Sequence, residues 1–123
     1  MKWKIGIGIH GEPGIRRGNL LPADDIATDI VERLVADLGL QGGEQVSVLV
    51  NGLGATPLEE LYIVYRKVNL ILSSLQVEIY RRYIGEFATS LEMAGCSITL
   101  LRLDDELKPL LDAPAASPIF LQV

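Results

Sequence analysis

The stretch VSVLVNGLGATPLE at residues 46–59 contains a strand, a glycine-rich turn and the start of a helix. Residues 46–50 are rich in valine and contain one polar side chain, a composition that is typical of a buried strand. Thr56-Pro57-Leu58-Glu59 has the spacing of a capping box, with threonine as the cap, proline first and glutamate third in the helix. The stretch therefore predicts a strand that runs directly into a helix, which is the unit of α/β architectures.

Helical periodicity predicts two long helices around this strand. The first begins near Pro22 and ends at Gly39, and its apolar stripe consists of Ile26, Ile30, Val31, Leu34, Val35 and Leu38. The second runs from Pro57 to about Leu75, and its stripe consists of Leu58, Leu61, Tyr62, Tyr65, Val68 and Leu72.

Three further strands are predicted, at residues 5–9, 77–84 and 96–103. One or two helical turns are expected at 86–95, a short helix after Asp104, and an extended, proline-marked tail at 112–118. Residues 1–123 are expected to form a single α+β domain. Its predicted architecture is a two-layer α/β sandwich, a mixed four-stranded sheet with helices mainly on one face.

Composition limits the classes of function. With 49% apolar and 22% charged residues, 123 residues can bury a core. The net charge of −5 argues against nucleic-acid binding, which needs concentrated Lys and Arg. One cysteine cannot form an internal disulfide, no Cys/His cluster has metal-ligand spacing, and no apolar run is long enough to span a membrane or form a signal peptide. We expect a cytoplasmic protein with no metal site and no membrane contact.

The only histidine of the chain, His10, lies in the stretch IGIGIHGEPG at residues 5–14. Isoleucine alternates with glycine up to His10, which gives a strand one apolar face and one bare face that a ligand can approach closely. Gly11, Pro13 and Gly14 then require a turn. From chemistry alone, His10 could be a general base, a nucleophile, a pH switch or only a turn residue.

Each of the other residues that could bind a ligand or take part in catalysis also has a purely structural interpretation. Asp24 and Asp25 fit a helix start better than a metal site. The 51–57 turn could bind phosphate, although it lacks P-loop and dinucleotide spacing, and we favour a tight turn that lets the helix pack on the sheet. Tyr62 and Tyr65 are interpreted as stripe residues, and Cys96 as an inert small hydrophobe.

Four blocks of the sequence, in the right order over nearly the whole chain, resemble the dihydroxyacetone kinase family. They match the second half of its substrate-binding subunit: GIHGEPG at 8–14, LVNGLGATP at 49–57 followed by ELY at 60–62, TSLEMAG at 89–95, and LLRLD at 100–104 followed by DAP at 112–114.

This resemblance implies that His10 binds dihydroxyacetone covalently as a hemiaminal, with Gly11 beside it in the substrate site. It also implies that the nucleotide, ADP or ATP with Mg, belongs to a partner subunit or domain and that none binds this chain. The bacterial version is fed by a phosphotransferase chain. Members of the family carry an additional N-terminal domain that holds the sugar hydroxyls, and they are typically homodimers. We therefore predict that the isolated chain has no kinase activity.

Two other functions fit the sequence. Relatives in this family bind dihydroxyacetone as transcriptional coactivators, so the chain could belong to a non-catalytic sensor. It could also be a purely structural pairing module in which His10 only completes a turn.

Overall fold

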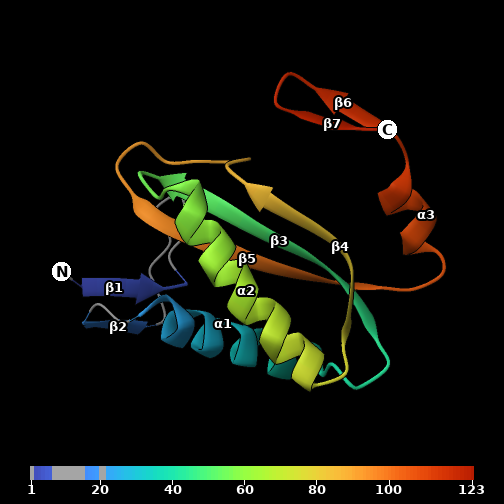
Figure 1. Cartoon of the computed structure of the whole chain (residues 1–123), viewed down its shortest axis with the longest axis horizontal. Coiled ribbons are helices and arrows are strands. Elements are labelled where there is room, and N and C mark those ends of the chain that lie inside the picture. Colours follow the sequence, from blue (N-terminus) through green and yellow to red (C-terminus); the bar gives the residue numbers. More distant parts are fainter. Residues whose placement is uncertain (1, 7–15, 20–21) are drawn as a thin grey trace.

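The computed structural model describes residues 2–6, 16–19 and 22–123 of the chain (Figure 1). In chain order its elements are β1 (Lys2–Ile5), β2 (Arg16–Asn19), α1 (Ala23–Leu38), β3 (Gln45–Gly54), α2 (Leu58–Ser74), β4 (Glu78–Gly85), β5 (Ala94–Leu103), α3 (Leu107–Asp112), β6 (Ala115–Ser117) and β7 (Phe120–Gln122).

The central sheet is mixed and has the strand order β4-β3-β5. β3 is parallel to β4, to which α2 connects it, and antiparallel to β5. A mixed sheet was expected from the sequence, but the described sheet has three strands and not four. The difference lies at the N-terminus, because β1 pairs with β2 in a separate two-stranded ribbon and does not join the sheet. Residues 7–9 of the first predicted strand lie outside the described residues.

The core lies between the central sheet and the two long helices. Alternate residues of β3, namely Val46, Val48 and Val50, are fully buried on the face that the helices cover. The other buried members of this core are Ala27, Val31, Leu61, Val64, Val68, Leu72, Val77, Ile98 and Leu100. Both long helices therefore pack on one face of the sheet, as the sequence predicted.

The long helices confirm the predicted spans but differ from the prediction in detail. Gly39 ends α1 in the left-handed conformation, with φ of 62°. α2 begins after Pro57 and has no side-chain hydrogen bond at its cap, so the predicted role of Thr56 as the cap was wrong. Leu58 and Tyr62 were predicted to face the core, yet they are 49% and 53% exposed. The buried stripe follows positions 61, 64, 68 and 72, and these two side chains lie beside it, toward the exposed side of α2.

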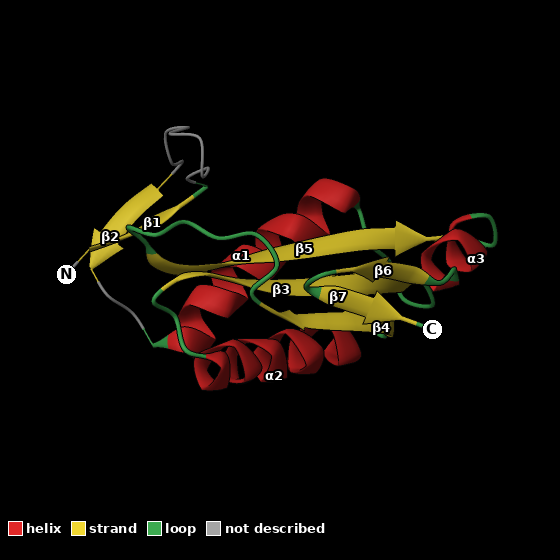
Figure 2. Ribbon diagram, turned by 90° about the horizontal axis from the view of Figure 1, so that it is seen from above, coloured by secondary structure: helices red, strands yellow, loops and turns green. Residues whose placement is uncertain are grey.

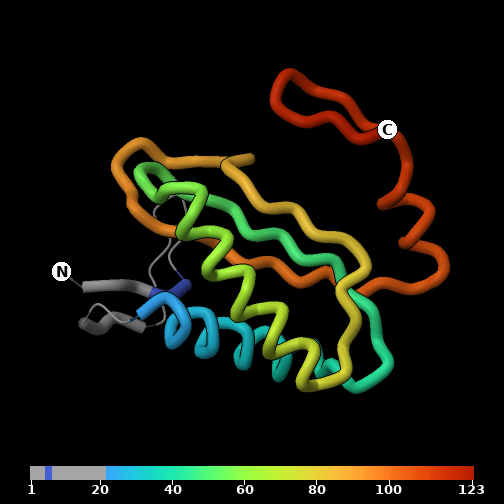
Figure 3. Tube along the Cα trace, viewed as in Figure 1, coloured from blue at the N-terminus to red at the C-terminus, as the bar shows by residue number. Residues whose placement is uncertain are grey.

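The segment after β4 contains no helix, contrary to the prediction for residues 86–95. It forms a loop that passes over the end of β3 before β5 begins (Figure 3). The tail after α3, predicted to be extended, folds back as the antiparallel β6–β7 ribbon. We call residues 107–122 the C-terminal arm; it lies over the sheet face opposite α1 and α2 (Figure 2).

Candidate functional site

His10 and Gly11 lie outside the described residues, but the two strands on either side of them are described. β1 and β2 pair antiparallel, with Ile5 opposite Arg16. Gly6 follows β1 with φ of 80°, a left-handed conformation that glycine adopts at little cost. The two predicted site residues therefore belong to the segment that joins two paired strands, and their role stays a prediction.

Asn51 holds the carboxyl end of β3 against the loop that follows β4. Its side chain is 5% exposed. Its Oδ1 accepts hydrogen bonds from the amides of Phe87 at 2.7 Å and Ala88 at 3.1 Å, and its Nδ2 donates to the carbonyl of Ala88 at 2.7 Å. Because all three polar contacts go to the loop backbone, Asn51 fixes the course of this loop.

Gly54 lies where the same loop contacts the end of β3 most closely. It adopts φ of 66°, and a Cβ at this position would lie 1.8 Å from the carbonyl oxygen of Met93. The Gly54 amide donates to Thr89 Oγ1 at 2.8 Å, and the Thr89 hydroxyl donates to Glu86 at 2.6 Å. Only glycine satisfies both the backbone conformation and this contact.

These contacts decide between the two interpretations of the glycine-rich turn. A phosphate site needs backbone N–H groups that point at the ligand. The amide of Gly54 is already bonded to Thr89, and that of Ala55 donates to the carbonyl of Met93 at 2.9 Å. A Cβ at Gly52 would lie 3.0 Å from Leu61 Cδ1, so this glycine lets α2 approach the sheet. The described contacts favour the tight turn.

The acidic pair at the start of α1 takes part in helix packing. Asp24 accepts hydrogen bonds from Arg66 of α2 on both carboxylate oxygens, at 2.9 and 2.8 Å. This ion pair joins the two long helices, and Asp24 and Asp25 lie in the first turn, where the helix dipole stabilises carboxylates. Within residues 2–6, 16–19 and 22–123, no three His, Cys, Asp or Glu side chains gather in a group that could hold a metal ion.

Tyr65 and Cys96, which the sequence analysis interpreted as structural residues, make contacts that agree with this interpretation. The Tyr65 hydroxyl accepts a 3.4 Å hydrogen bond from Arg82, whose guanidinium also lies 5.9 Å from the centre of the Tyr65 ring. Burial, and secondarily the charge of Glu60, raise the pKa of Cys96. A thiol with a raised pKa is a poor nucleophile at neutral pH, which agrees with an inert cysteine.

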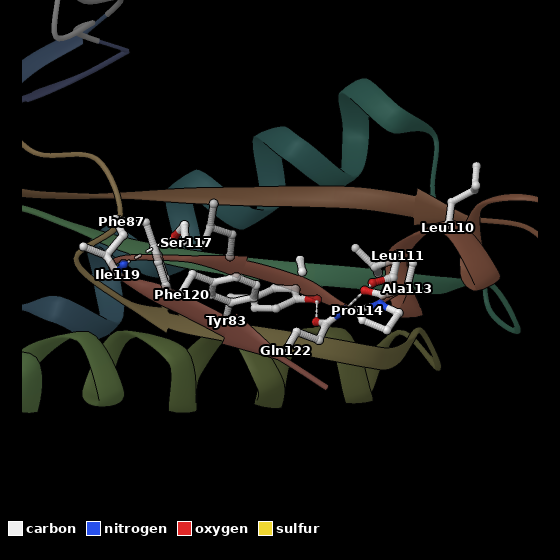
Figure 4. A pocket seen from close by; sticks show the side chains of 12 residues that line it. Tyr83, Phe87, Leu110, Leu111, Ala113, Pro114, Ser117, Ile119, Phe120 and Gln122 are labelled. Carbon is white, nitrogen blue, oxygen red and sulfur yellow. Dashed lines mark hydrogen bonds between the residues drawn. The ribbon is translucent and has the colours of Figure 1, made fainter.

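An apolar hollow lies between the sheet and the C-terminal arm (Figure 4). Its volume is about 530 Å³. Leu49, Tyr83 and Phe87 form its floor, and the arm covers it with Leu111, Pro114, Ile119, Phe120 and neighbouring residues. The Phe120 ring packs against Tyr83 and Phe87, with centroid distances of 5.7 and 6.1 Å.

A polar cluster joins the arm to β4 beside this hollow. Tyr80 donates to Asp112 Oδ2 at 2.5 Å, and Arg81 Nε donates to Asp112 Oδ1 at 2.5 Å. Arg81 and Tyr83 also donate to Gln122 Oε1, at 3.1 and 2.9 Å. Hydrogen bonds from Tyr80 and then Arg81 lower the pKa of Asp112 below its ordinary value of 3.8, and the bond to Asp112 raises the pKa of Tyr80.

Sequence reasoning missed this cluster and the hollow. Asp112 and Gln122 lie about thirty to forty positions from their partners on β4, so no local spacing connects them. The alternation of apolar and polar residues in Phe120-Leu121-Gln122 was the one available signal of a strand, and three residues are too few to establish a period.

None of the helices in the described part of the chain combines the length and the apolar character that crossing a bilayer requires.

Residues 1–119 match the model of the Dak1 domain family. A relative from Listeria innocua serovar 6a, the dihydroxyacetone-binding subunit DhaK of PTS-dependent dihydroxyacetone kinase 2, is 50% identical over 117 residues. That alignment covers 95% of this chain and 35% of the relative.

Two further proteins are similar. The L-erythrulose kinase of Pectobacterium atrosepticum is 42% identical over 120 residues, which are 94% of this chain and 20% of that protein. The solved structure of the dihydroxyacetone kinase operon co-activator Dha-DhaQ has a TM-score of 0.83 and 33% identity, and the match covers 92% of this chain and 36% of that one. The chain therefore spans about a third of the length of the DhaK relative and less of the erythrulose kinase.

Proposed function

This chain belongs to the Dak1 domain family, and from that premise we propose that it is the substrate-binding part of a dihydroxyacetone kinase in which His10 binds the ketose covalently. The observation that carries the proposal is the 50% identity to a dihydroxyacetone-binding subunit over 117 residues. Identity at this level over almost the whole chain supports a shared role better than the fold does, because one fold serves many functions.

The proposed chemistry needs a neutral imidazole. One ring nitrogen of His10 attacks the carbonyl carbon, the π electrons of the carbonyl pass to its oxygen, and the proton lost by the ring balances the one that this oxygen gains. The product is a hemiaminal that forms without loss of water and reverses freely. Such a bond provides affinity for a small ketose and excludes glycerol, which has no electrophilic carbon. Gly11, which has no side chain, would leave room for the substrate beside the ring.

The remaining steps of the reaction are assigned to other subunits or domains. We propose that a nucleotide-binding kinase subunit or domain with ADP or ATP and Mg supplies the phosphoryl group, and that an N-terminal substrate-binding domain holds the hydroxyls of the ketose. The chain spans only 35% of the length of the DhaK relative, which leaves ample sequence for such a domain. We expect the isolated chain to have no kinase activity. The complete assembly is proposed to be a homodimer in the cytoplasm.

A non-catalytic sensor or coactivator is the second candidate. It is favoured by the similarity to the operon co-activator, whose TM-score is 0.83. Both candidates bind the ketose, so they differ in the phosphoryl transfer step alone. Addition of a nucleotide-binding kinase subunit to the full-length protein separates them, because only the kinase then converts dihydroxyacetone to its phosphate.

Covalent capture is tested by NMR spectroscopy with dihydroxyacetone that carries ¹³C at the carbonyl carbon. The expected result is a protein-bound signal in the region of tetrahedral carbon, together with a mass increase of one intact ketose. The His10→Asn variant should give neither signal, and erythrulose in place of dihydroxyacetone tests the alternative substrate. An adduct that persists in His10→Asn, or no adduct in the full-length protein at saturating ketose, would contradict the proposal.

A further inference from the structure

The C-terminal arm is attached to the sheet by side chains. The β6–β7 ribbon forms a sheet of its own and shares no strand pairing with β4-β3-β5. All three residues of β6 are exposed, and α3 has no buried residue. A two-stranded ribbon this short is not stable by itself in water, so the arm keeps its position through a small number of contacts.

A β-bulge in β4 creates the strongest of these contacts. Val46 of β3 pairs with Ile79 and Ser47 pairs with Arg81, so Tyr80 is an extra residue without a partner on β3. In a regular strand, neighbouring side chains point to opposite faces. The bulge changes this, and both Tyr80 and Arg81 reach Asp112, one on each carboxylate oxygen.

The other attachments lie on the same side of the arm. Gln122 accepts from Arg81 and Tyr83 of β4, and Phe120 packs on Tyr83 and Phe87. Apart from the hydrogen bonds that the amides of Leu107 and Lys108 donate to Asp104 at the base of the arm, every hydrogen bond and ring contact from the arm to the described sheet and loops ends on β4 or on Phe87. The arm is thus fixed along one edge strand and joined covalently to the other edge strand, β5, through residues 104–106.

We propose that the C-terminal arm is a hinged cover, which swings about residues 104–106 and exposes the apolar hollow while the helices and the central sheet stay folded. Asp112 holds the cover closed. The hollow beneath it loses most of its lining when the arm leaves, because Leu111, Pro114, Ile119 and Phe120 move away together. Opening therefore exposes Leu49, Tyr83 and Phe87 on a face that is otherwise shielded.

Opening of the arm alone requires less free energy than unfolding of the whole domain. The contacts that break are a few partly exposed hydrogen bonds and the rings around Phe120, whereas Val46, Val48 and Val50 keep their burial under the helices. Segments with little buried apolar area and few backbone hydrogen bonds to the core open at the low end of the range of local stabilities.

Hydrogen exchange followed by mass spectrometry tests the cover in the intact chain. Amides of residues 107–122 should exchange faster than those of β3 in the parent protein. Asp112→Asn should accelerate exchange of the arm about fivefold, at the upper end of the range for partly exposed ion pairs, and leave β3 unchanged. Asp37→Asn makes the same change of charge on an exposed residue of α1, away from the arm and its hinge, and should have no effect on the arm.

A second variant keeps the test independent of charge. Tyr80→Phe removes one hydrogen bond to Asp112 and should accelerate exchange of the arm less than Asp112→Asn does. The proposal is overturned if the arm and β3 exchange at the same rate in the parent protein, since the arm would then open only on global unfolding. It is also overturned if Asp112→Asn and Asp37→Asn behave alike.

Acid should open the arm in the same way. The charged and titratable groups around Asp112 are Tyr80 and Arg81 of β4, which bond it, Arg82, which lines the same surface depression, and Lys108 of α3, which lies 5.4 Å from the centre of the Tyr80 ring. Because folding lowers the pKa of Asp112, its stabilising effect is complete above the ordinary value of 3.8 and is lost as the pH falls through the lower value of the folded state. NMR signals of Phe120 should shift in that interval in the parent protein and not in Asp112→Asn; identical titrations would count against the role of Asp112.

Discussion

Replacement of Asn51 by alanine should destabilise the domain more than any other single polar truncation at the edge where β3 ends. The amide side chain makes three hydrogen bonds to the backbone of residues 87 and 88 and is 5% exposed. In Asn51→Ala two amides and one carbonyl lose their partner.

The magnitude follows from these three groups. A buried polar group that is left without a partner costs about 1–3 kcal/mol. Because the loop lies partly at the surface, water restores some of the lost hydrogen bonding, and we expect a total loss of about 3 kcal/mol in the free energy of unfolding. For a urea dependence of about 1.5 kcal/mol/M, the midpoint of unfolding falls by about 2 M.

The assay is urea unfolding followed by far-ultraviolet circular dichroism, with Asn69→Ala as the matched control. Asn69 is exposed on α2, and alanine is the better helix former, so this control should change the free energy by no more than about 0.5 kcal/mol. If Asn51→Ala lies within about 1 kcal/mol of Asn69→Ala, the loop is not held by this side chain and the reasoning is wrong.

Gly54→Ala should cost roughly 3 kcal/mol of unfolding free energy, because the new Cβ meets the Met93 carbonyl; Gly43→Ala, which has a similar positive φ and open space around it, should cost only about 1 kcal/mol by the same urea assay. Equal effects would mean that the backbone conformation alone matters. The raised pKa of Cys96 predicts that its rate of alkylation by iodoacetamide reaches half of its maximum at a pH above the ordinary thiol value of 9.0, and that Glu60→Gln shifts this midpoint slightly downward. Fast alkylation of the folded protein at neutral pH would refute the account of the thiol.

Local patterns predicted the elements that form the core. The valine-rich run at 46–50 and the two amphipathic stripes identified β3, α1 and α2, because burial of one face leaves a periodic trace in the sequence. The same logic failed at Leu58 and Tyr62, where an apolar side chain on an exposed face imitates a stripe residue.

The loop and the arm could not be predicted in this way. The course of residues 86–93 is decided by Asn51, more than thirty positions away, which binds backbone amides that an isolated helix would have used. The arm depends on Asp112 and Gln122 meeting β4 across a similar separation. For the candidate site, the likeness of residues 8–14 and three other blocks led to the family that the comparison of residues 1–119 shows, and His10 itself lies outside the described residues.

The extra residue in β4, Tyr80, connects a one-residue difference in strand length to a contact of the C-terminal arm. A relative that lacks the counterpart of Tyr80 would have a regular strand in which the arginine still lies opposite Ser47 on the arm side, but the hydrogen bond from Tyr80 to the carboxylate at position 112 would be missing. A single deletion in an alignment of this strand would therefore mark relatives whose C-terminal segment is held through the arginine alone, with one of the two hydrogen bonds to the carboxylate lost.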